Sequence, residues 1–498
     1  MREKLGHLGK GVAIYGAGDA AVNVVNFLLL AVYVKFGYLD TNDYGAIAII
    51  TAFEGIAKIV SRLGLDGAFM RHFHDRAAGG PLERMASTIV WFLLGVNILV
   101  FAPAIALSGW VGDRFMHNIA YVPAFRLMLI NTFLISLTFV PFHLMRLRNE
   151  AVTYSGFVFA RSAGTTLLRG VLVMGLGWGF TGWYAADLIL TLALWPLLWR
   201  WMSPVLTTAF DRKELATVLR FGLPRLPHGI AQQALEAGNK MLLKAHVGLE
   251  QVGVYQNGFT LGTGIRFFTS AFETAWAPFY YATAKQPDAR TVLSKTTTYG
   301  VAVLTLLVAT TVAVSHDVIL VILTPTYLAA VPVIPLIAIG MAAQGLYLFT
   351  SIGLNLTSKT QYYPVATFAA LAVGLGAGAL LMPRFGMTGA AVAFALSGAT
   401  QTLVAFTFAR RFYPIQYEIG RLARVVAAGA LAAIGAVWLV PDLPPVAGLV
   451  VRGLVTTSAF GAVLLASGFF RKSERDFLNE LVARFRRRPT ALPDADAK

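Results

Sequence analysis

Long apolar stretches recur along the whole sequence, and each is close to the roughly 20 residues that an α-helix needs to cross a lipid bilayer. Fourteen of them predict an all-α, polytopic membrane protein with about fourteen transmembrane helices. The stretches run over residues 12–35, 43–63, 85–107, 119–142, 153–176, 179–199, 221–245, 252–280, 292–314, 329–353, 362–382, 387–409, 422–440 and 446–469. The first is longer than the apolar core of a cleaved signal peptide, so we expect it to be retained as a helix.

The composition supports this class of protein. Of the 498 residues, 57% are hydrophobic and 13% are charged, whereas a soluble domain carries about 25% charged residues. The 41 lysines and arginines outnumber the 25 acidic residues and give a net charge of +16. Because the basic residues lie between apolar stretches, they indicate loops beside a membrane, and we expect no nucleic-acid partner. The lack of cysteine excludes disulfides and thiolate metal sites.

The basic residues also predict the orientation of the chain, because cytoplasmic loops of membrane proteins are enriched in lysine and arginine. With the N-terminus placed inside, 30 of these residues fall in the inside loops and tails. Only four fall outside, namely Lys35, Arg114, Lys244 and Arg384. We therefore predict an even number of helices with both termini in the cytoplasm.

An internal repeat relates the two halves of the chain. A shift of 213 residues aligns residues 9–34 with 222–247 at seven identical positions, among them Asn26 with Asn239. At a shift of 208 the next helices align, Gly45 with Gly253 and Lys58 with Arg266. The shift spans six predicted helices, so the two copies have the same orientation in the membrane, which is a transporter architecture.

These patterns predict two six-helix lobes related by a pseudo-twofold repeat, followed by two further helices. The first lobe covers residues 1–200, the second covers 201–415, and the extra helices cover 416–470. Residues 471–498 have apolar positions at helical spacing among basic residues. This predicts a basic amphipathic tail on the cytoplasmic face, with a solvated helical tail as the alternative.

Ionisable residues lie inside several predicted helices, where each costs on the order of 2.5–3.5 kcal/mol at the bilayer centre. The basic residues that we predict to bind substrate are Lys58, Arg126, Arg161, Arg169, Lys240 and Arg266. Guanidinium and ammonium groups match phosphate oxygens, so a diphosphate headgroup suits a cavity that they line. The amides of Asn23, Asn26 and Asn239 suit sugar hydroxyls, and we predict that they bind substrate too.

Two other roles stay open for these charges. Glu54 with Lys58, and Glu236 with Lys240, are spaced i, i+4 with the acid first, which favours pairing within one helix. Arg126, Arg161 and Arg169, in the predicted helices of the first half, have no such local partner. Their long side chains are also compatible with reaching the membrane interface or pairing between helices.

No motif for catalysis or cofactor binding is readable. Residues 16–21 fit the dinucleotide pattern G-x-G-x-x-A by letter. That pattern needs a preceding strand, whereas here it lies in an apolar stretch where small residues favour helix packing. We see no phosphate-binding loop and no nucleophile with its base, so we expect no enzyme, no cofactor and no metal site.

Six short segments carry a family resemblance that covers nearly the whole chain. They are residues 43–45 (DYG), 63–68 (LGLDGA), 221–224 (FGLP), 248–255 (GLEQVGVY), 275–279 (AWAPF) and 385–391 (FGMTGAA). In this order and spacing they resemble the polysaccharide transporters of the multidrug/oligosaccharidyl-lipid/polysaccharide exporter superfamily. Within it, the chain looks like the bacterial O-antigen and exopolysaccharide flippases.

The resemblance implies a flippase of the bacterial inner membrane that works by alternating access. Its cargo would be a lipid-linked oligosaccharide of the undecaprenyl-diphosphate type, used for cell-surface polysaccharide. Polysaccharide polymerase and chain-length proteins are implied as possible partners, beside membrane lipid. An acid in the first helix couples transport to an ion gradient in some relatives, and Asp19 matches it. Glu54 and Glu273 are the next candidates for ion coupling.

Three alternatives accompany this hypothesis. A flippase for the lipid-linked peptidoglycan precursor also carries a diphosphate. A multidrug exporter of the same superfamily handles cationic drugs, which the basic excess disfavours. A non-transporting membrane partner of polysaccharide synthesis, such as a polymerase, is expected to carry a large periplasmic loop, whereas the predicted outside loops are short. Neighbouring genes for glycosyltransferases or for cell division would separate the first alternative from the glycan flippase.

The predicted orientation can be tested with reporter fusions. Fusions at Asp75, Arg212 and Arg475 are expected to report the cytoplasm, and a fusion at Asp317 the periplasm, because the basic loops hold one face inside. Activity of paired cytoplasmic and periplasmic reporters measures this. A periplasmic signal at Arg212 contradicts the assignment of two six-helix lobes.

Overall fold

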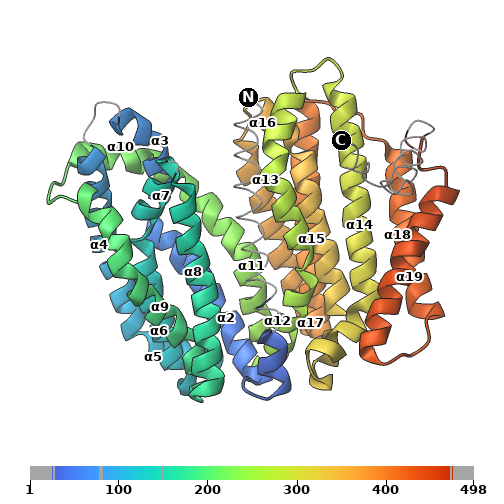
Figure 1. The fold of residues 1–498 in the computed structure, drawn as a ribbon, viewed down its shortest axis with the longest axis horizontal. Helices are drawn as coiled ribbons and strands as arrows, with labels where there is room; N and C mark the ends of the chain where they lie inside the picture. The colour runs from blue at the N-terminus through green and yellow to red at the C-terminus, as the bar shows by residue number, and fades with distance from the viewer. Residues whose placement is uncertain (1–24, 26–28, 78–81, 149, 472–473, 475–498) are drawn as a thin grey trace, which may run out of the picture. The chain divides into compact units, whose positions relative to one another are not determined.

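The computed structural model describes residues 25, 29–77, 82–148, 150–471 and 474. Over these residues the chain is helical, with short turns of 3₁₀- and π-helix and no strand. The helices are α2 (Thr41–Arg62), α3 (Leu65–Ala77), α4 (Leu82–Ala106), α5 (Ser108–Val111), α6 (Val122–Ser136), α7 (Phe139–Leu147), α8 (Ala151–Gly170), α9 (Gly179–Met202), α10 (Arg212–Gly222), α11 (Leu226–His246), α12 (Leu249–Gly262), α13 (Ile265–Thr283), α14 (Ala289–Ile322), α15 (Val333–Thr350), α16 (Ile352–Leu356), α17 (Tyr362–Phe412), α18 (Ile419–Leu439) and α19 (Pro445–Ala466) (Figure 1).

The prediction of an all-α, polytopic membrane protein is confirmed. In the described ranges, ten helices are long and apolar enough to cross a membrane. They cover eleven of the fourteen predicted stretches, because α17 contains two of them. The stretch 12–35 lies largely outside the described residues. The remaining two stretches are 221–245 and 252–280. The first contains most of α11, which carries several polar and charged residues, and the second is divided into α12 and α13, of 14 and 19 residues. None of these three helices counts as a span on its own.

Two breaks in the backbone shape these helices. Within α17, Gly386 has a φ of +50° and a ψ of −124°, so the chain bends between the stretches predicted at 362–382 and 387–409. Glycine adopts this left-handed conformation without the steric cost that a Cβ brings. The second break, at Thr263 and Gly264, separates α12 from α13. It divides the stretch 252–280, which the sequence predicts as one helix.

The chain forms two compact units. The first holds Met1–Ala282 and Ser315–Pro414, and the second holds Thr283–Val314 and Ile415–Lys498. In the second unit α18 packs along α19. The first part of α14 belongs with them because Ser294 donates a hydrogen bond of 2.6 Å to the carbonyl of Gln416. The stretch 292–314, which we predicted in the second lobe, therefore groups with the last two helices.

A buried ion-pair network organises the second unit. The guanidinium of Arg421 lies 2.9 Å from Glu418 and 2.9 Å from Glu474, and its side chain is only 8% exposed. Arg421 also covers the ring of Phe469 at 4.4 Å. Because Glu474 follows α19, these contacts fix the chain directly after the last helix. Most of the predicted tail, 471–498, lies outside the described residues.

In the first unit, α2 is well defined by its own sequence. It begins behind a capping box in which the carboxylate of Asp40 accepts from the backbone N–H of Asp43 at 2.7 Å, and the carboxylate of Asp43 accepts from the N–H of Asp40 at 3.0 Å. It ends at Arg62 and is followed by Leu63 and Gly64, both with positive φ. The predicted stretch 43–63 is therefore confirmed as a helix of nearly the same length.

The two repeats meet where α2 crosses α12. A Cβ placed on Gly45 would overlap the carbonyl oxygen of Leu249, and a Cβ placed on Gly253 would overlap the carbonyl oxygen of Thr41. Residues 41 and 45 correspond to 249 and 253 at the shift of 208 found in the sequence. Gly45 meets Leu249, and the equivalent Gly253 meets Thr41, which is the equivalent of Leu249. This is the reciprocal pattern that a twofold axis produces.

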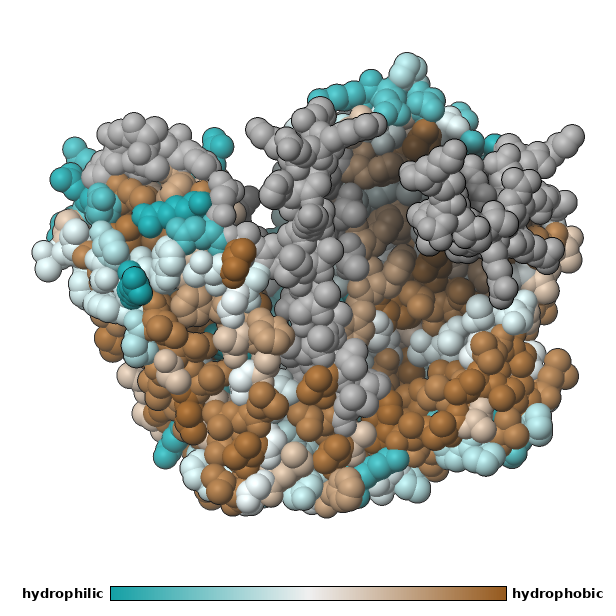
Figure 2. Space-filling model, viewed as in Figure 1, coloured by the Kyte–Doolittle hydropathy of each residue, from teal (hydrophilic) through white to brown (hydrophobic). Residues whose placement is uncertain are grey.

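The end of the first repeat that we predict to be cytoplasmic is polar. Helix α10 is amphipathic and packs on α3 and α4. The carboxylate of Asp211 caps it by accepting from the N–H groups of Lys213 and Glu214, and these bonds hold the pKa of Asp211 below its ordinary value. In Figure 2, hydrophilic residues gather around α3 and α10, and apolar residues cover the helices below them. This is the pattern expected at a membrane surface.

The glycine crossing of α2 and α12 can be tested by enlarging one side chain. Gly253→Ala is expected to destabilise the protein by about 1–3 kcal/mol, because the added methyl group meets the backbone of Thr41. Gly376→Ala is the control, since a Cβ there has no neighbour within 4 Å, and alanine favours a helix by up to ~1 kcal/mol over glycine. Thermal unfolding of the purified variants measures both. Equal stability of the two contradicts the close approach.

Candidate functional site

Three helices of the first repeat bring charged side chains together. Glu54 and Lys58 lie on α2, Arg161 and Arg169 on α8, and Asp187 on α9. We call these five residues the α2–α8–α9 cluster. Spacings of four and eight residues place the members from one helix on the same helix face. The structure therefore groups three of the basic residues that we predicted to bind substrate.

Two ion pairs neutralise part of this cluster. The ammonium of Lys58 lies 2.6 Å from the carboxylate of Glu54, one turn earlier on α2. The guanidinium of Arg169 lies 2.5 Å from the carboxylate of Asp187, with both side chains about one-fifth exposed. Arg169 also stacks 4.2 Å above the ring of Trp183. Arg169 thus has both a charged and an aromatic partner, which indicates a structural role beside any role in binding.

Arg161 differs from these residues. Among the described residues, no carboxylate lies within ion-pair distance of it. It lies within electrostatic reach of Glu54 and Asp187, whose carboxylates pair with other residues, and of Arg62 and Arg169, which repel it. Three basic groups face two carboxylates in the cluster, so one positive charge is left over. Such a surplus suits an incoming anion, and guanidinium bonds phosphate oxygens in pairs.

The second repeat arranges its charges differently. Arg266, at the start of α13, lies 3.3 Å from the carboxylate of Glu236 on α11, and its side chain is 63% exposed. Lys240 follows Glu236 by one turn and is buried, with its Nζ atom 4.8 Å above the ring of Phe259. The predicted pair of Glu236 with Lys240 is therefore not the pair that the structure forms.

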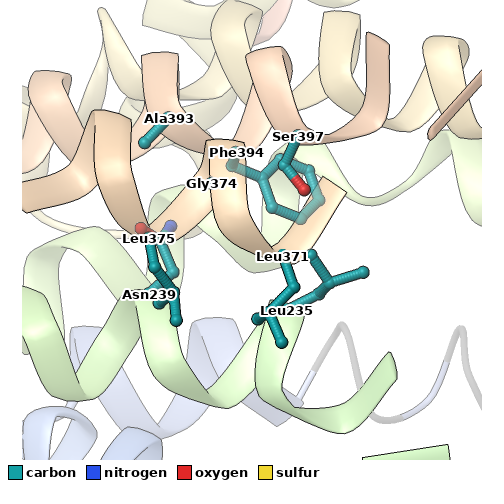
Figure 3. A pocket seen from close by; sticks show the side chains of 8 residues that line it. All are labelled: Leu235, Asn239, Leu371, Gly374, Leu375, Ala393, Phe394 and Ser397. Carbon is teal, nitrogen blue, oxygen red and sulfur yellow. The ribbon is translucent and has the colours of Figure 1, made fainter. Parts of the chain in front are cut away.

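Asn239 serves the packing of the second repeat. Its amide donates to the hydroxyl of Tyr255 at 2.9 Å and to the carbonyl of Ala390 at 3.1 Å, so it ties α11 to α12 and α17. Asn239 also lines a small pocket between α11 and α17, shown in Figure 3. The other lining residues are Leu235, Leu371, Gly374, Leu375, Ala393, Phe394 and Ser397. Its empty volume of about 200 Å³ includes space that is open to solvent, so the enclosed part is too small for an oligosaccharide.

The remaining predicted residues lie elsewhere. Arg126 is exposed on α6 and donates to the hydroxyl of Ser108 at 2.7 Å, and no described contact joins it to the cluster. Glu273 is exposed on α13, and no described ion pair joins it to Arg266. Asp19, Asn23 and Asn26 lie outside the described residues. No group of three or more metal-binding side chains occurs within the described ranges.

Sequence reasoning missed the pairing of Arg169 with Asp187. Both lie inside predicted helices, at 153–176 and 179–199, but a partner 18 residues away is not visible from local spacing. A signal was present, because the two residues lie at similar distances on either side of the turn at Gly177. Two antiparallel helices joined by a short turn bring such residues to the same depth.

Comparison with known proteins agrees with this architecture. The sequence model of a family described as "Polysaccharide biosynthesis protein" matches residues 38–332. No curated protein matches the chain. Among solved structures, the lipid II flippase MurJ in an inward closed conformation is similar with a TM-score of 0.74 at 11% identity, over 92% of this chain and 100% of that one.

Two further similar structures are multidrug transporters. An inward-facing transporter of the multidrug resistance MATE family, in the MOP superfamily, gives a TM-score of 0.64 at 13% identity, over 81% of this chain and 94% of that one. A MATE protein in complex with MaD3S gives a TM-score of 0.57 at 15% identity, over 84% and 96% of the two chains. At these identities the likeness shows a shared fold. The family resemblance drawn from the sequence is confirmed by the family match.

The different surroundings of Arg161 and Arg169 predict different effects of neutralising each. Arg169→Gln is expected to cost about 1–3 kcal/mol of stability, because it leaves the half-buried carboxylate of Asp187 without its partner. Adding Asp187→Asn should recover part of that loss. Arg161→Gln, on the same helix, is expected to stay within ~0.5 kcal/mol of the parent protein. Thermal unfolding of the three variants beside the parent protein decides this, and a larger loss at position 161 than at 169 contradicts the assignment.

Proposed function

Because the chain belongs to the family of polysaccharide biosynthesis proteins, we propose that it is a flippase for a lipid-linked oligosaccharide. The cargo is carried on an undecaprenyl-diphosphate-type lipid and crosses the bacterial inner membrane for assembly into cell-surface polysaccharide, such as O-antigen or exopolysaccharide. The family and the shared fold are those of membrane transporters and not of an enzyme.

The observation that carries this proposal is the surplus positive charge of the α2–α8–α9 cluster. A buried or half-buried charge without a partner is costly in a membrane, so a group such as Arg161 is expected to meet an anion during the working cycle. A lipid diphosphate offers several oxygens to a guanidinium fork. Its sugars would then contact amide side chains such as Asn23 and Asn26, whereas Asn239 is already engaged in helix packing.

Alternating access is the mechanism that we propose. Two six-helix lobes within a fold of fourteen helices, with both termini in the cytoplasm, would open in turn to either side. The reciprocal crossing of α2 and α12 supports this arrangement, because equivalent parts of the two repeats meet there. Asp19, Glu54 and Glu273 stay candidates for ion coupling, and a polysaccharide polymerase and chain-length proteins stay candidate partners.

The fold alone does not choose among substrates. It is shared with a lipid II flippase and with multidrug transporters, all at 15% identity or less. The family match favours a glycan of polysaccharide synthesis over the peptidoglycan precursor. The net positive charge of the cluster disfavours cationic drugs, which acidic cavities attract. A non-transporting partner of polysaccharide synthesis has no evident use for an unpaired arginine inside the membrane.

The role of Arg161 can be measured by flipping of a lipid-linked glycan in reconstituted vesicles, normalised to folded protein. Arg161→Gln is expected to slow flipping roughly ten-fold or more, since a charge-assisted hydrogen bond contributes about 1.5–3 kcal/mol. Arg161→Lys is expected to keep part of the activity, because the charge remains while the paired geometry is lost.

Arg114→Gln provides the control for this assay. Arg114 is an exposed arginine outside the cluster, so its loss changes net charge equally without touching the proposed site. If Arg161→Gln, Arg169→Gln and Lys58→Gln, each as a single variant, all keep full normalised flipping, the cluster has no part in the mechanism. The family assignment would stand in that case, because it rests on the sequence match.

A further inference from the structure

Lys240 stands apart from the other basic residues of the predicted site. It is 7% exposed, whereas the side chains of Lys58 and Arg266 are 47% and 63% exposed. A group that solvent hardly reaches is poorly placed to receive a bulky headgroup. The ammonium form of lysine loses far more hydration on burial than the neutral amine, so the surroundings of Lys240 and its protonation state depend on each other.

An aromatic ring covers the ammonium group of Lys240. Its Nζ atom lies over Phe259 of α12, whose ring packs 5.2 Å from that of Phe394 on α17. Among the described residues, Glu236 is the one group that acts on it electrostatically. The helices around it carry further ionisable groups: His228, Glu236, Lys244 and His246 on α11, Glu250 and Tyr255 on α12, Arg266, Glu273, Tyr280 and Tyr281 on α13, and Asp43, Tyr44, Glu54, Lys58 and Arg62 on α2. The charged residues of α17 are Arg384, Arg410 and Arg411, and α17 contacts Asn239 through the carbonyl of Ala390.

Glu236 has two possible partners. In this structure its carboxylate pairs with Arg266 at 3.3 Å. Lys240 follows it at i+4 on the same helix, which is the favourable order for an acid and a base. A single carboxylate pairs well with one of them at a time, and a charged Lys240 competes for it while a neutral Lys240 does not. The observed pair with Arg266 is the one expected when Lys240 is neutral.

We propose that Lys240 is a proton-binding site that switches the partner of Glu236. A proton from water adds to the lone pair of the Lys240 amine, and the resulting ammonium draws the carboxylate away from Arg266. Loss of that proton to water returns the carboxylate to Arg266. No other bond forms or breaks. The use of this switch in transport rests on the proposed function, but the switch itself is a property of α11 and α13.

The position of Arg266 gives the switch a mechanical consequence. Arg266 is the second residue of α13 and follows the break at Thr263 and Gly264. Its ion pair with Glu236 therefore ties the start of α13 to α11, and losing the pair frees α13 at that break. The helix before the break, α12, carries Gly253 at the crossing with α2. Protonation of Lys240 is thus connected to the place where the repeats meet.

The first repeat lacks this device. At the shift of 213, Asn23 stands where the second repeat has Glu236, and Phe27 stands where it has Lys240. Lys58, at the place of Arg266, pairs with Glu54 of its own helix instead. Proton binding by a buried lysine is therefore assigned to the second repeat alone.

A fluorine label beside Arg266 tests the switch without any glycan. The chain has no cysteine, so Phe267→Cys, at a position that is 55% exposed, accepts a single trifluoromethyl label. Its ¹⁹F signal in lipid nanodiscs is followed from about pH 5 to about pH 10, which covers the range in which buried and exposed lysines titrate. The signal is expected to titrate between two positions.

Substitutions then assign the titrating group. Lys240→Met has no amine to protonate, so its signal is expected to stay at the high-pH position. Lys240→Arg stays charged, so its signal is expected to stay at the low-pH position. Glu236→Gln should leave a signal that does not titrate. Lys244→Met, the next lysine on α11, is the matched control and should titrate like the parent. A parent signal that does not titrate, or unaltered titration in Lys240→Met, overturns the proposal. A failed flipping assay with an intact ¹⁹F titration would count against the proposed function only.

Discussion

The close approach of two backbones at Gly45 and Gly253 is the constraint on which the first unit depends. Helices that touch through glycine bring their carbonyl groups within reach of each other, and no larger residue fits. Because α2 also packs against α11, one helix of the first repeat contacts two of the second. Gly55 on α2 is covered by the side chain of Gln233 on α11. Any change in the relation of the repeats has to alter this small set of contacts.

The charged residues of the two repeats are paired in different ways. In the first, two carboxylates pair with Lys58 and Arg169 and leave Arg161 unmatched. In the second, one carboxylate stands between an exposed arginine and a buried lysine. An unmatched arginine favours binding of an anion, and a shared carboxylate favours exchange between two states. Duplicated helices have therefore kept their packing at the crossing while their polar residues have diverged.

Much of the fold was predictable because bilayer crossing imposes one length and one composition on every helix. The ends of α2 and the bend at Gly386 fall close to the predicted limits. The break at Thr263 and Gly264 was missed, although Gly262, Gly264 and Arg266 lie beside it, because membrane helices tolerate glycine and the stretch as a whole is apolar. In the site, the spacing of Glu54 and Lys58 was enough to predict their pair. The choice of Arg266 over Lys240 by Glu236 depends on how α13 approaches α11, which no local spacing encodes.

The same reasoning explains why charge alone was a weak guide to the roles of individual residues. Six basic residues were predicted to bind substrate on the ground that burial in a membrane is costly. That cost is met in several ways here: by a carboxylate and an indole at Arg169, by a hydroxyl at Arg126, and by an aromatic ring at Lys240. Only where such partners are missing among the described residues, as at Arg161, does the cost argue for an external ligand. The useful criterion is therefore which oppositely charged, polar or aromatic groups lie around each charged side chain. By this criterion Arg161 of the first repeat is the candidate for binding an anion, and Lys240 of the second repeat is the candidate for binding a proton.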